Sequence, residues 1–218
     1  MRKIPIASII AMIFSAVVLI FQFVRISILS GELSITTQLP MQLSEEASLL
    51  TIIESTLSIL IPLALFVISI MIVCEGCRKN PSQERINLFF KLNITPIMLM
   101  FVSAVESTFY FFVYESRFTL EYTWLELLTS ILILTVYIFT INKKIKTGYL
   151  LMIVCLAFVL VEVFRFSFPE MSYAYVVGSN IHISTFLAAV LFYLAYLFLG
   201  LSLTMYRRRD NVKNTSGT

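Results

Sequence analysis

Six apolar segments, each long enough to cross a lipid bilayer, dominate this chain of 218 residues. A helix needs about 20 apolar residues to cross the hydrocarbon layer, and the connections between these segments are short. The segments cover residues 4–28, 49–74, 88–114, 123–142, 148–168 and 180–206.

Composition supports a membrane protein, because 59% of the residues are hydrophobic and only 13% are charged. Soluble domains have about 25% charged residues. Backbone polar groups must be paired within lipid, and the apolar segments are too long for barrel strands, so they are expected to be helices. The sequence predicts an all-α fold with one six-helix transmembrane domain over residues 1–206 and a short basic tail over 207–218. The segment from Ile4 to Val24 is longer than a signal-peptide core and is expected to be retained as the first span.

The positions of the basic residues predict the orientation of the spans. Thirteen of the sixteen Lys and Arg residues fall on one side of the six-span topology, and only Arg25, Arg117 and Arg165 fall on the other. Cytoplasmic loops carry the excess of Lys and Arg, so both termini are predicted in the cytoplasm. The clustering of the basic residues in short loops is typical of orientation signals, and no nucleic-acid partner is expected. The expected location is the plasma membrane.

A carboxylate inside the third span is the strongest candidate for function. Glu106 lies within Phe101–Tyr114, and on a helix it shares one polar stripe with Ser103, Ser107, Tyr110 and Tyr114. A carboxylate at such depth needs a partner, a water-filled cavity or a bound proton. Replacing Glu106 with Gln is expected to abolish ligand binding or transport while the protein still inserts. A structural ion pair of Glu106 with a basic residue is the alternative.

Other ionisable and polar groups fall in the same outer half of their spans, and together they predict an outward-facing polar pocket. The predicted ligand-binding residues are Glu106, Glu162, Arg165, His182, Glu54, Glu126 and Tyr110. Several have structural alternatives. Thr51 and Thr123, each three residues before a Glu, form capping-box patterns that would place Glu54 and Glu126 in the first turns of helices. Glu162 and Arg165 are three residues apart and can neutralise each other.

Three further motifs have structural interpretations. The Ala7-x-x-x-Ala11 spacing allows close helix approach, within the bundle or with another chain. Cys74-Glu-Gly-Cys77 supplies too few ligands for a structural zinc site, so a reduced pair at a helix end is expected. Asn93-Ile-Thr95 is a glycosylation sequon inside a span and is expected to stay unmodified.

Pro62 and Pro96 are expected to bend their helices. The sequence contains no motif of a known catalytic site or cofactor, and no enzymatic activity, cofactor or metal is expected.

The sequence is most consistent with a component that binds or transports a small solute. Six spans, cytoplasmic termini, the Ala7-x-x-x-Ala11 spacing and no soluble domain look somewhat like the substrate-binding subunits of energy-coupling vitamin-uptake transporters. That family is usually richer in glycine than this chain. The resemblance implies a cytoplasmic ATPase and a membrane coupling partner. The alternatives are a sensory or regulatory membrane module that signals through a partner protein, and a structural membrane protein without a ligand. The expected partners are the lipid bilayer, a small molecule from the outer side and a membrane or cytoplasmic subunit.

Overall fold

The computed structural model describes residues 6–36, 45–78, 81–114, 120–142, 147–167 and 179–216, and within them every regular element is a helix. Side chains near several helix ends lie outside the described set. The helices are α1 (Ile6–Thr36), α2 (Glu45–Cys77), α3 (Gln83–Leu92), α4 (Ile94–Tyr114), α5 (Leu120–Asn142), α6 (Thr147–Ser167) and α8 (Ser179–Ser216). The all-α prediction is therefore confirmed for the described residues.

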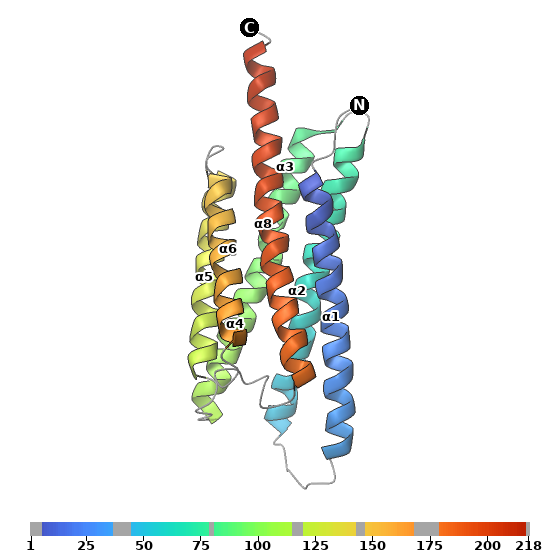
Figure 1. Ribbon diagram of the computed structural model, residues 1–218, viewed down its shortest axis with the longest axis vertical. Coiled ribbons are helices and arrows are strands. Elements are labelled where there is room, and N and C mark those ends of the chain that lie inside the picture. The colour runs from blue at the N-terminus through green and yellow to red at the C-terminus, as the bar shows by residue number, and fades with distance from the viewer. Residues whose placement is uncertain are drawn as a thin grey trace.

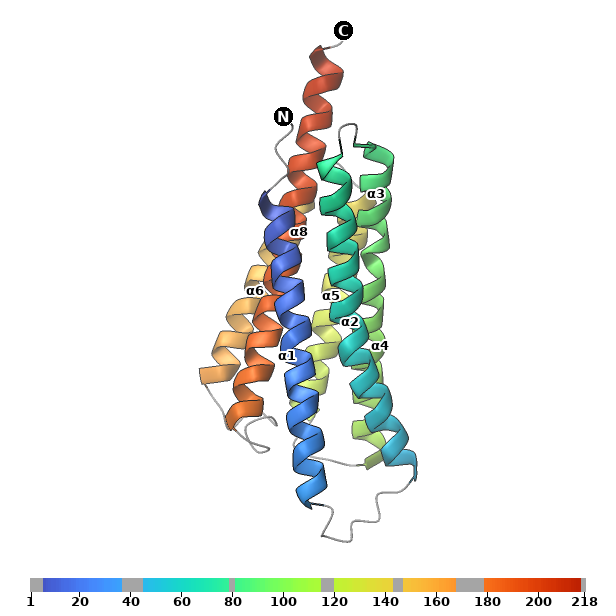
Figure 2. The same ribbon diagram turned by 90° about the vertical axis from the view of Figure 1, so that its right-hand side faces the viewer.

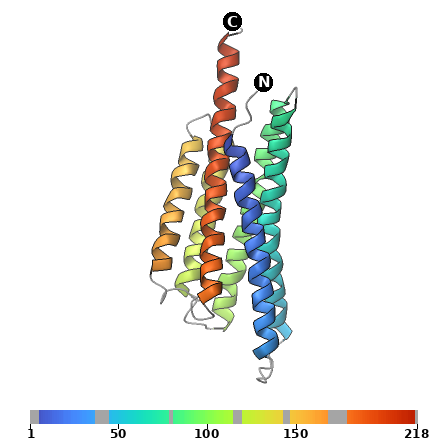
Figure 3. The ribbon, with the colours of Figure 1, turned by 45° about the vertical axis from the view of Figure 1, so that its right-hand side comes forward.

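The long helices run up and down as an elongated bundle (Figure 1). Each packs against the next along the chain, with α3 and α4 following one another along one line (Figure 2), and α8 returns to pack against α1. The helices thus form a closed ring in the order α1, α2, α4, α5, α6 and α8. The start of α1 and the end of α8 lie at the same end, which we call the terminal end (Figure 3). The opposite end, where α4 stops and α5 starts, is called the far end.

The outer surface of the bundle is apolar. Ile153 and Leu160 on α6 and Leu128 on α5 each expose more than 60% of their surface, and similar residues are exposed on α1, α2, α4 and α8. Helices that are apolar on both their buried and exposed faces require an apolar surrounding. Among the described residues, four segments are long and apolar enough to span a membrane, and two shorter apolar stretches lie in α5 and α6. The four are Ile6–Val24, Thr56–Cys77, Gln83–Glu106 and Phe186–Tyr206; the shorter stretches are Leu127–Asn142 and Gly148–Phe164.

Several boundaries differ from those predicted. The connection between the first two predicted spans, which end at residue 28 and start at residue 49, is shorter than expected, because α1 continues to Thr36 and α2 starts at Glu45. The predicted tail after residue 206 continues as helix to Ser216, and α8 extends beyond the other helices at the terminal end (Figure 1). Polar residues with good helix propensity can prolong a helix once the apolar part has nucleated it.

The third span is interrupted where one continuous helix was expected. α3 ends at Leu92 and α4 starts at Ile94, with Asn93 in a turn between them. Pro96 has no N–H to donate to the carbonyl of Leu92, and its ring disfavours a continuous helix there. Instead of the bend expected at Pro96, the helix is interrupted one turn before the proline.

The capping-box interpretation of Glu54 and Glu126 is wrong. α2 starts at Glu45, well before Thr51, and α5 starts at Leu120, before Thr123. Both threonines therefore lie inside helices, where the backbone N–H groups already have helical partners. Glu54 and Glu126 belong to helix interiors near the far end of the bundle.

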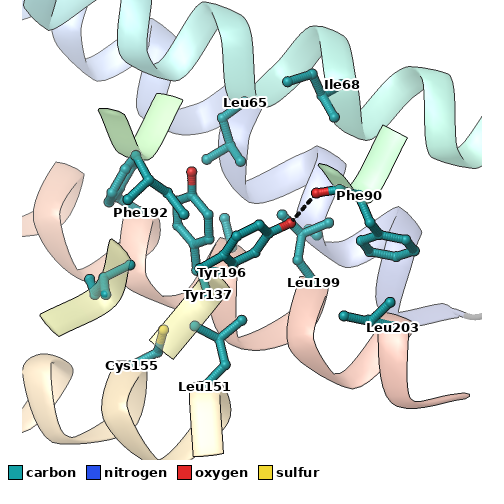
Figure 4. Close-up of a cluster of buried hydrophobic side chains, with 14 of the residues drawn as sticks. Leu65, Ile68, Phe90, Tyr137, Leu151, Cys155, Phe192, Tyr196, Leu199 and Leu203 are labelled. Atoms are coloured by element: carbon teal, nitrogen blue, oxygen red, sulfur yellow. Dashed lines mark hydrogen bonds between the residues drawn. The ribbon is translucent and has the colours of Figure 1, made fainter. Parts of the chain in front are cut away.

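Many of the described core residues lie in the half of the bundle nearer the terminal end. Figure 4 shows side chains from several helices meeting there, among them Leu65 of α2, Tyr137 of α5, Cys155 of α6 and Tyr196 of α8. Tyr137 and Tyr196 are the largest fully buried side chains, and their rings meet edge to face with centroids 6.1 Å apart. The Tyr137 hydroxyl donates to the carbonyl oxygen of Phe90 at 2.7 Å, which ties α5 to α3.

Small residues allow close packing around α8. Ala7, Ala11 and Ser15 of α1 are buried, and the Ser8 and Ser202 hydroxyls are hydrogen-bonded between α1 and α8. The small-residue face of α1 therefore docks within its own chain, and is not free to pair with a second copy. On the other side, Gly148 of α6 meets Gly200 and Thr204 of α8.

Candidate functional site

Glu162 is the predicted site residue whose inward position the structure supports. The buried stripe of α6 contains Leu151 and Cys155, both with 0% exposure. Glu162 follows Cys155 by seven residues, which is two helical turns on the same face. Ile153 and Leu160 mark the opposite, lipid-like face. Glu162 is half-buried, and it has an interaction partner.

Glu106 occupies a different position relative to the core. The buried stripe of α4 contains Ile97 and Ala104, seven residues apart. Glu106 lies two residues after Ala104, which is about 200° around the helix. It is half-buried, borders the exposed Val102 one turn earlier, and has an interaction partner. The polar stripe predicted for this span is therefore not the most buried face of α4.

The two carboxylates are carried by helices that share α5 as a neighbour and otherwise pack against different helices. α4 packs chiefly against α2 and α5, whereas α6 packs chiefly against α5 and α8. The other predicted site residues are in helices, but their side chains lie outside the described set, so their convergence stays a prediction. They are Glu54 in α2, Tyr110 in α4, Glu126 in α5, Arg165 in α6 and His182 in α8.

Around the predicted pocket, the side chains of α6 that the structure describes are at most half-buried. From Leu156 to Ser167, the far-end part of α6, no residue whose side chain is described is buried. In the same direction, Gln22 of α1 carries a buried Oε1 atom that has no hydrogen-bonding partner among the described residues. A carboxylate and an amide thus lie in the far-end half of an apolar bundle.

A second polar centre, at the turn between α2 and α3, was not expected from the sequence. Glu75 is only 4% exposed, and its Oε1 accepts the backbone N–H of Ser82 at 3.0 Å. Its Oε2 lies 3.2 Å from Nη1 of Arg78 and 4.0 Å from Nη1 of Arg85. This carboxylate holds the turn closed, and both of its oxygens are engaged in these contacts. The sequence signal for this centre was Glu75, an acidic residue inside the Cys-x-x-Cys motif. Cys74 and Cys77 form no disulfide and are exposed.

Asn93, Ser69 and Tyr196 form a third set of polar groups, and all three are buried in the bundle core. The side-chain polar atoms of Asn93 and the hydroxyls of Ser69 and Tyr196 have no hydrogen-bonding partner among the described residues. The sequence pattern identifies Asn93 only as part of a glycosylation sequon. A polar residue three positions before a proline in an apolar span was the signal that could have identified it.

No protein-family model, curated protein or solved structure matches the chain. The function must therefore be argued from the residues of this chain.

Proposed function

We propose that this chain is a multi-pass protein of the plasma membrane that binds or transports a small solute through a polar pocket at the far end of the bundle. In this proposal all six long helices span the membrane, both termini are cytoplasmic, and the pocket opens to the outside. The observation that carries the proposal is the half-buried Glu162 on the inward stripe of α6. A carboxylate inside a membrane-spanning bundle is costly by about 3 kcal/mol and is retained chiefly for function.

The distribution of packing supports an outward rather than an inward opening. Tyr137, Tyr196 and Leu199 fill the interior nearer the terminal end with fully buried side chains. The far-end half contains Glu162 and the Oε1 atom of Gln22, which has no hydrogen-bonding partner among the described residues. Polar groups near one end of an otherwise apolar bundle favour solute entry from that end.

The charge distribution supports placing the terminal end in the cytoplasm. Arg78 and Arg85, whose guanidinium groups are more than half exposed, lie at this end beside the turn between α2 and α3. The basic residues Arg207, Arg208 and Arg209 lie in the last three turns of α8, whose end extends beyond the bundle at the same end (Figure 1). Such an excess of positive charge is typical of the cytoplasmic side.

The test is solute binding and uptake by the purified protein in proteoliposomes, screened with labelled amino acids, vitamins, sugars and nucleosides. Glu162→Gln is expected to abolish binding of the solute identified, because it removes the charge on the inward stripe. Glu106→Gln measures separately whether the α4 carboxylate belongs to the pocket. Glu84→Gln is the matched control, since Glu84 is exposed in the first turn of α3. Unchanged binding and uptake in correctly inserted Glu162→Gln would refute the proposed role of this pocket.

The extension of α8 favours a second candidate, a sensory or regulatory module that signals through a partner. A helix that continues to Ser216 beyond the other helices offers a rigid connection to a cytoplasmic or membrane subunit (Figure 1). Deleting residues 208–218 distinguishes the two functions. An uptake protein that acts alone keeps its activity after the deletion, whereas a signalling module keeps solute binding and loses the response of its partner.

A further inference from the structure

The side chain of Asn93 has unsatisfied hydrogen-bonding capacity in the middle of the bundle. Its residue exposure is 0%, and neither Oδ1 nor Nδ2 has a hydrogen-bonding partner among the described residues. Leaving a buried polar group unpaired costs about 1–3 kcal/mol. Native proteins satisfy the large majority of such groups with protein atoms or ordered water. Asn93 therefore needs a partner that the described chain does not supply.

The local backbone explains why the amide is not used as a helix cap. An Asn before a helix normally accepts a hydrogen bond from the N–H group two or three residues ahead, and its own backbone is extended. Here the third residue ahead is Pro96, which has no N–H group. Asn93 itself has φ −67° and ψ −1°, a helical conformation. The geometry of the interruption therefore leaves the Asn93 side chain available for another hydrogen-bonding partner.

Two hydroxyl groups in the same core share this property. Ser69 on α2 and Tyr196 on α8 expose 1% and 0% of their surface, and neither hydroxyl has a partner among the described residues. Hydroxyls inside helices usually bond to a carbonyl oxygen one turn earlier. Thr140 and Thr204 do so, at 2.7 Å from Val136 and 2.8 Å from Gly200. Ser69 forms no such bond, so its hydroxyl is free for another partner.

The contacts of Tyr137 connect the end of α3, just before Asn93, to Tyr196 of α8. The Tyr137 hydroxyl bonds to the carbonyl of Phe90, one helical turn before Asn93, and its ring packs against that of Tyr196. Figure 4 shows Phe90, Tyr137 and Tyr196 in the same cluster as Leu65 and Ile68 of α2, and Ser69 follows Ile68 directly in the chain. The interruption at Asn93 therefore adjoins a core into which α2, α5 and α8 all contribute.

We propose that the interruption between α3 and α4 is a binding site for a small uncharged polar guest, either water or a solute of similar size. Asn93 offers it both a donor and an acceptor, and Ser69 and Tyr196 are its further hydrogen-bonding partners. The guest is uncharged because Glu75 is the only charged residue among the described buried ones, and it is engaged at the turn between α2 and α3. An isolated ion would have no counter-charge in this core. Interrupted membrane helices use their irregular turns as binding sites in the same way.

Nuclear magnetic resonance of the full chain in lipid nanodiscs tests the site directly. The protein is deuterated and labelled with ¹⁵N-asparagine, and the Asn93 side-chain signal is assigned through the backbone of Asn93 and Ile94. We expect a nuclear Overhauser cross-peak between the Asn93 Nδ2 protons and a long-lived water. A solute guest would instead give a saturable shift of the same signal on titration with urea or formamide, so the two sources are distinguished.

Two variants show that the signal arises at this position. Asn93→Leu should remove the cross-peak or the saturable shift. Asn87→Leu should retain it, because Asn87 is exposed on α3. If the assigned Asn93 side chain of the unmodified protein shows neither a water cross-peak nor a saturable shift, the proposed site does not exist. This experiment does not depend on Glu162, so the site can fail while the proposed far-end pocket stands, or the reverse.

Discussion

The close approach of α6 and α8 at Gly148 makes a quantitative prediction about stability. A Cβ atom added at Gly148 would overlap Oγ1 of Thr204 and would lie 3.1 Å from the carbonyl oxygen of Gly200. The Thr204 hydroxyl is itself bonded to that carbonyl at 2.8 Å. Gly148→Ala therefore forces either a rotation of Thr204, with loss of its hydrogen bond, or a separation of the two helices.

The magnitude follows from these two routes. Losing the hydrogen bond costs about 0.5–1.5 kcal/mol, and overpacking a well-packed interface costs about 1–3 kcal/mol. Alanine has a better helix propensity than glycine, which stabilises the variant by up to about 1 kcal/mol. The expected net loss in the free energy of unfolding is about 1–2 kcal/mol. For a chain of this size, that corresponds to a melting temperature lower by about 2–8 °C.

The buried thiol of Cys155 provides the assay. Cys155 lies on α6 with 0% exposure, whereas Cys74 and Cys77 are exposed. In a background with both exposed cysteines replaced by serine, a thiol-reactive fluorescent dye reports the temperature at which the interior of the bundle opens. Gly148→Ala should lower that temperature.

Two comparison variants make the result specific to the predicted contact. Thr204→Ala removes the overlapping oxygen, so the double variant should lose less stability than the sum of the two single changes. At Gly200 a Cβ atom would approach the carbonyl oxygen of Gly148 and Cδ2 of Leu151 no closer than 3.3 Å, so Gly200→Ala should cost less than Gly148→Ala. Strict additivity of Gly148→Ala and Thr204→Ala would show that the two positions are not in contact, and would refute this packing.

Two further predictions concern the turn between α2 and α3 and the orientation of the bundle. Glu75→Ala should lower the free energy of unfolding by about 1.5–3 kcal/mol in the same dye assay, because a buried charge-assisted acceptor is lost. Arg78→Ala should lower it by less than about 1 kcal/mol, since the Arg78 side chain is 56% exposed. An equal effect of both changes would contradict the central role of the carboxylate. For the orientation, Cys77 should react with a membrane-impermeant maleimide only after cells are permeabilised, while a cysteine introduced at Ser116 should react in intact cells; the reverse pattern would place the termini outside.

The helical architecture could be predicted from the sequence because apolar length is sufficient to define a membrane span. The exact helix ends could not. Thr36, Glu45 and Ser216 lie in polar stretches, where helix continuation depends on propensity and on neighbouring helices rather than on burial in lipid. The same limitation explains why the capping boxes predicted at Thr51 and Thr123 are wrong. Each threonine has the three-residue spacing to a glutamate that is typical of a cap, but the helix has already started before it.

The candidate site was only partly accessible to sequence reasoning. The predicted Glu162 is on the inward stripe, which its seven-residue spacing from Cys155 makes evident once Cys155 is known to be buried. For Glu106, a stripe of polar residues indicated a shared face, but only the burial of Ile97 and Ala104 shows which face of α4 meets the core. Asn93 was missed because its significance depends on Pro96 and on buried hydroxyls from other helices, and sequence periodicity does not relate groups on different helices.

The contact between α1 and α8 also constrains biogenesis. Ser8 and Ser202 are separated by 194 positions, so their hydrogen bond cannot form until the last span has left the ribosome. The earlier spans can associate as successive pairs during synthesis, because each packs against the next. Until then, the alanine- and serine-lined face of α1 has only lipid or an insertion factor to cover it. A chain truncated before residue 179 would lack α8 and would therefore leave the ring of helices open between α1 and α6.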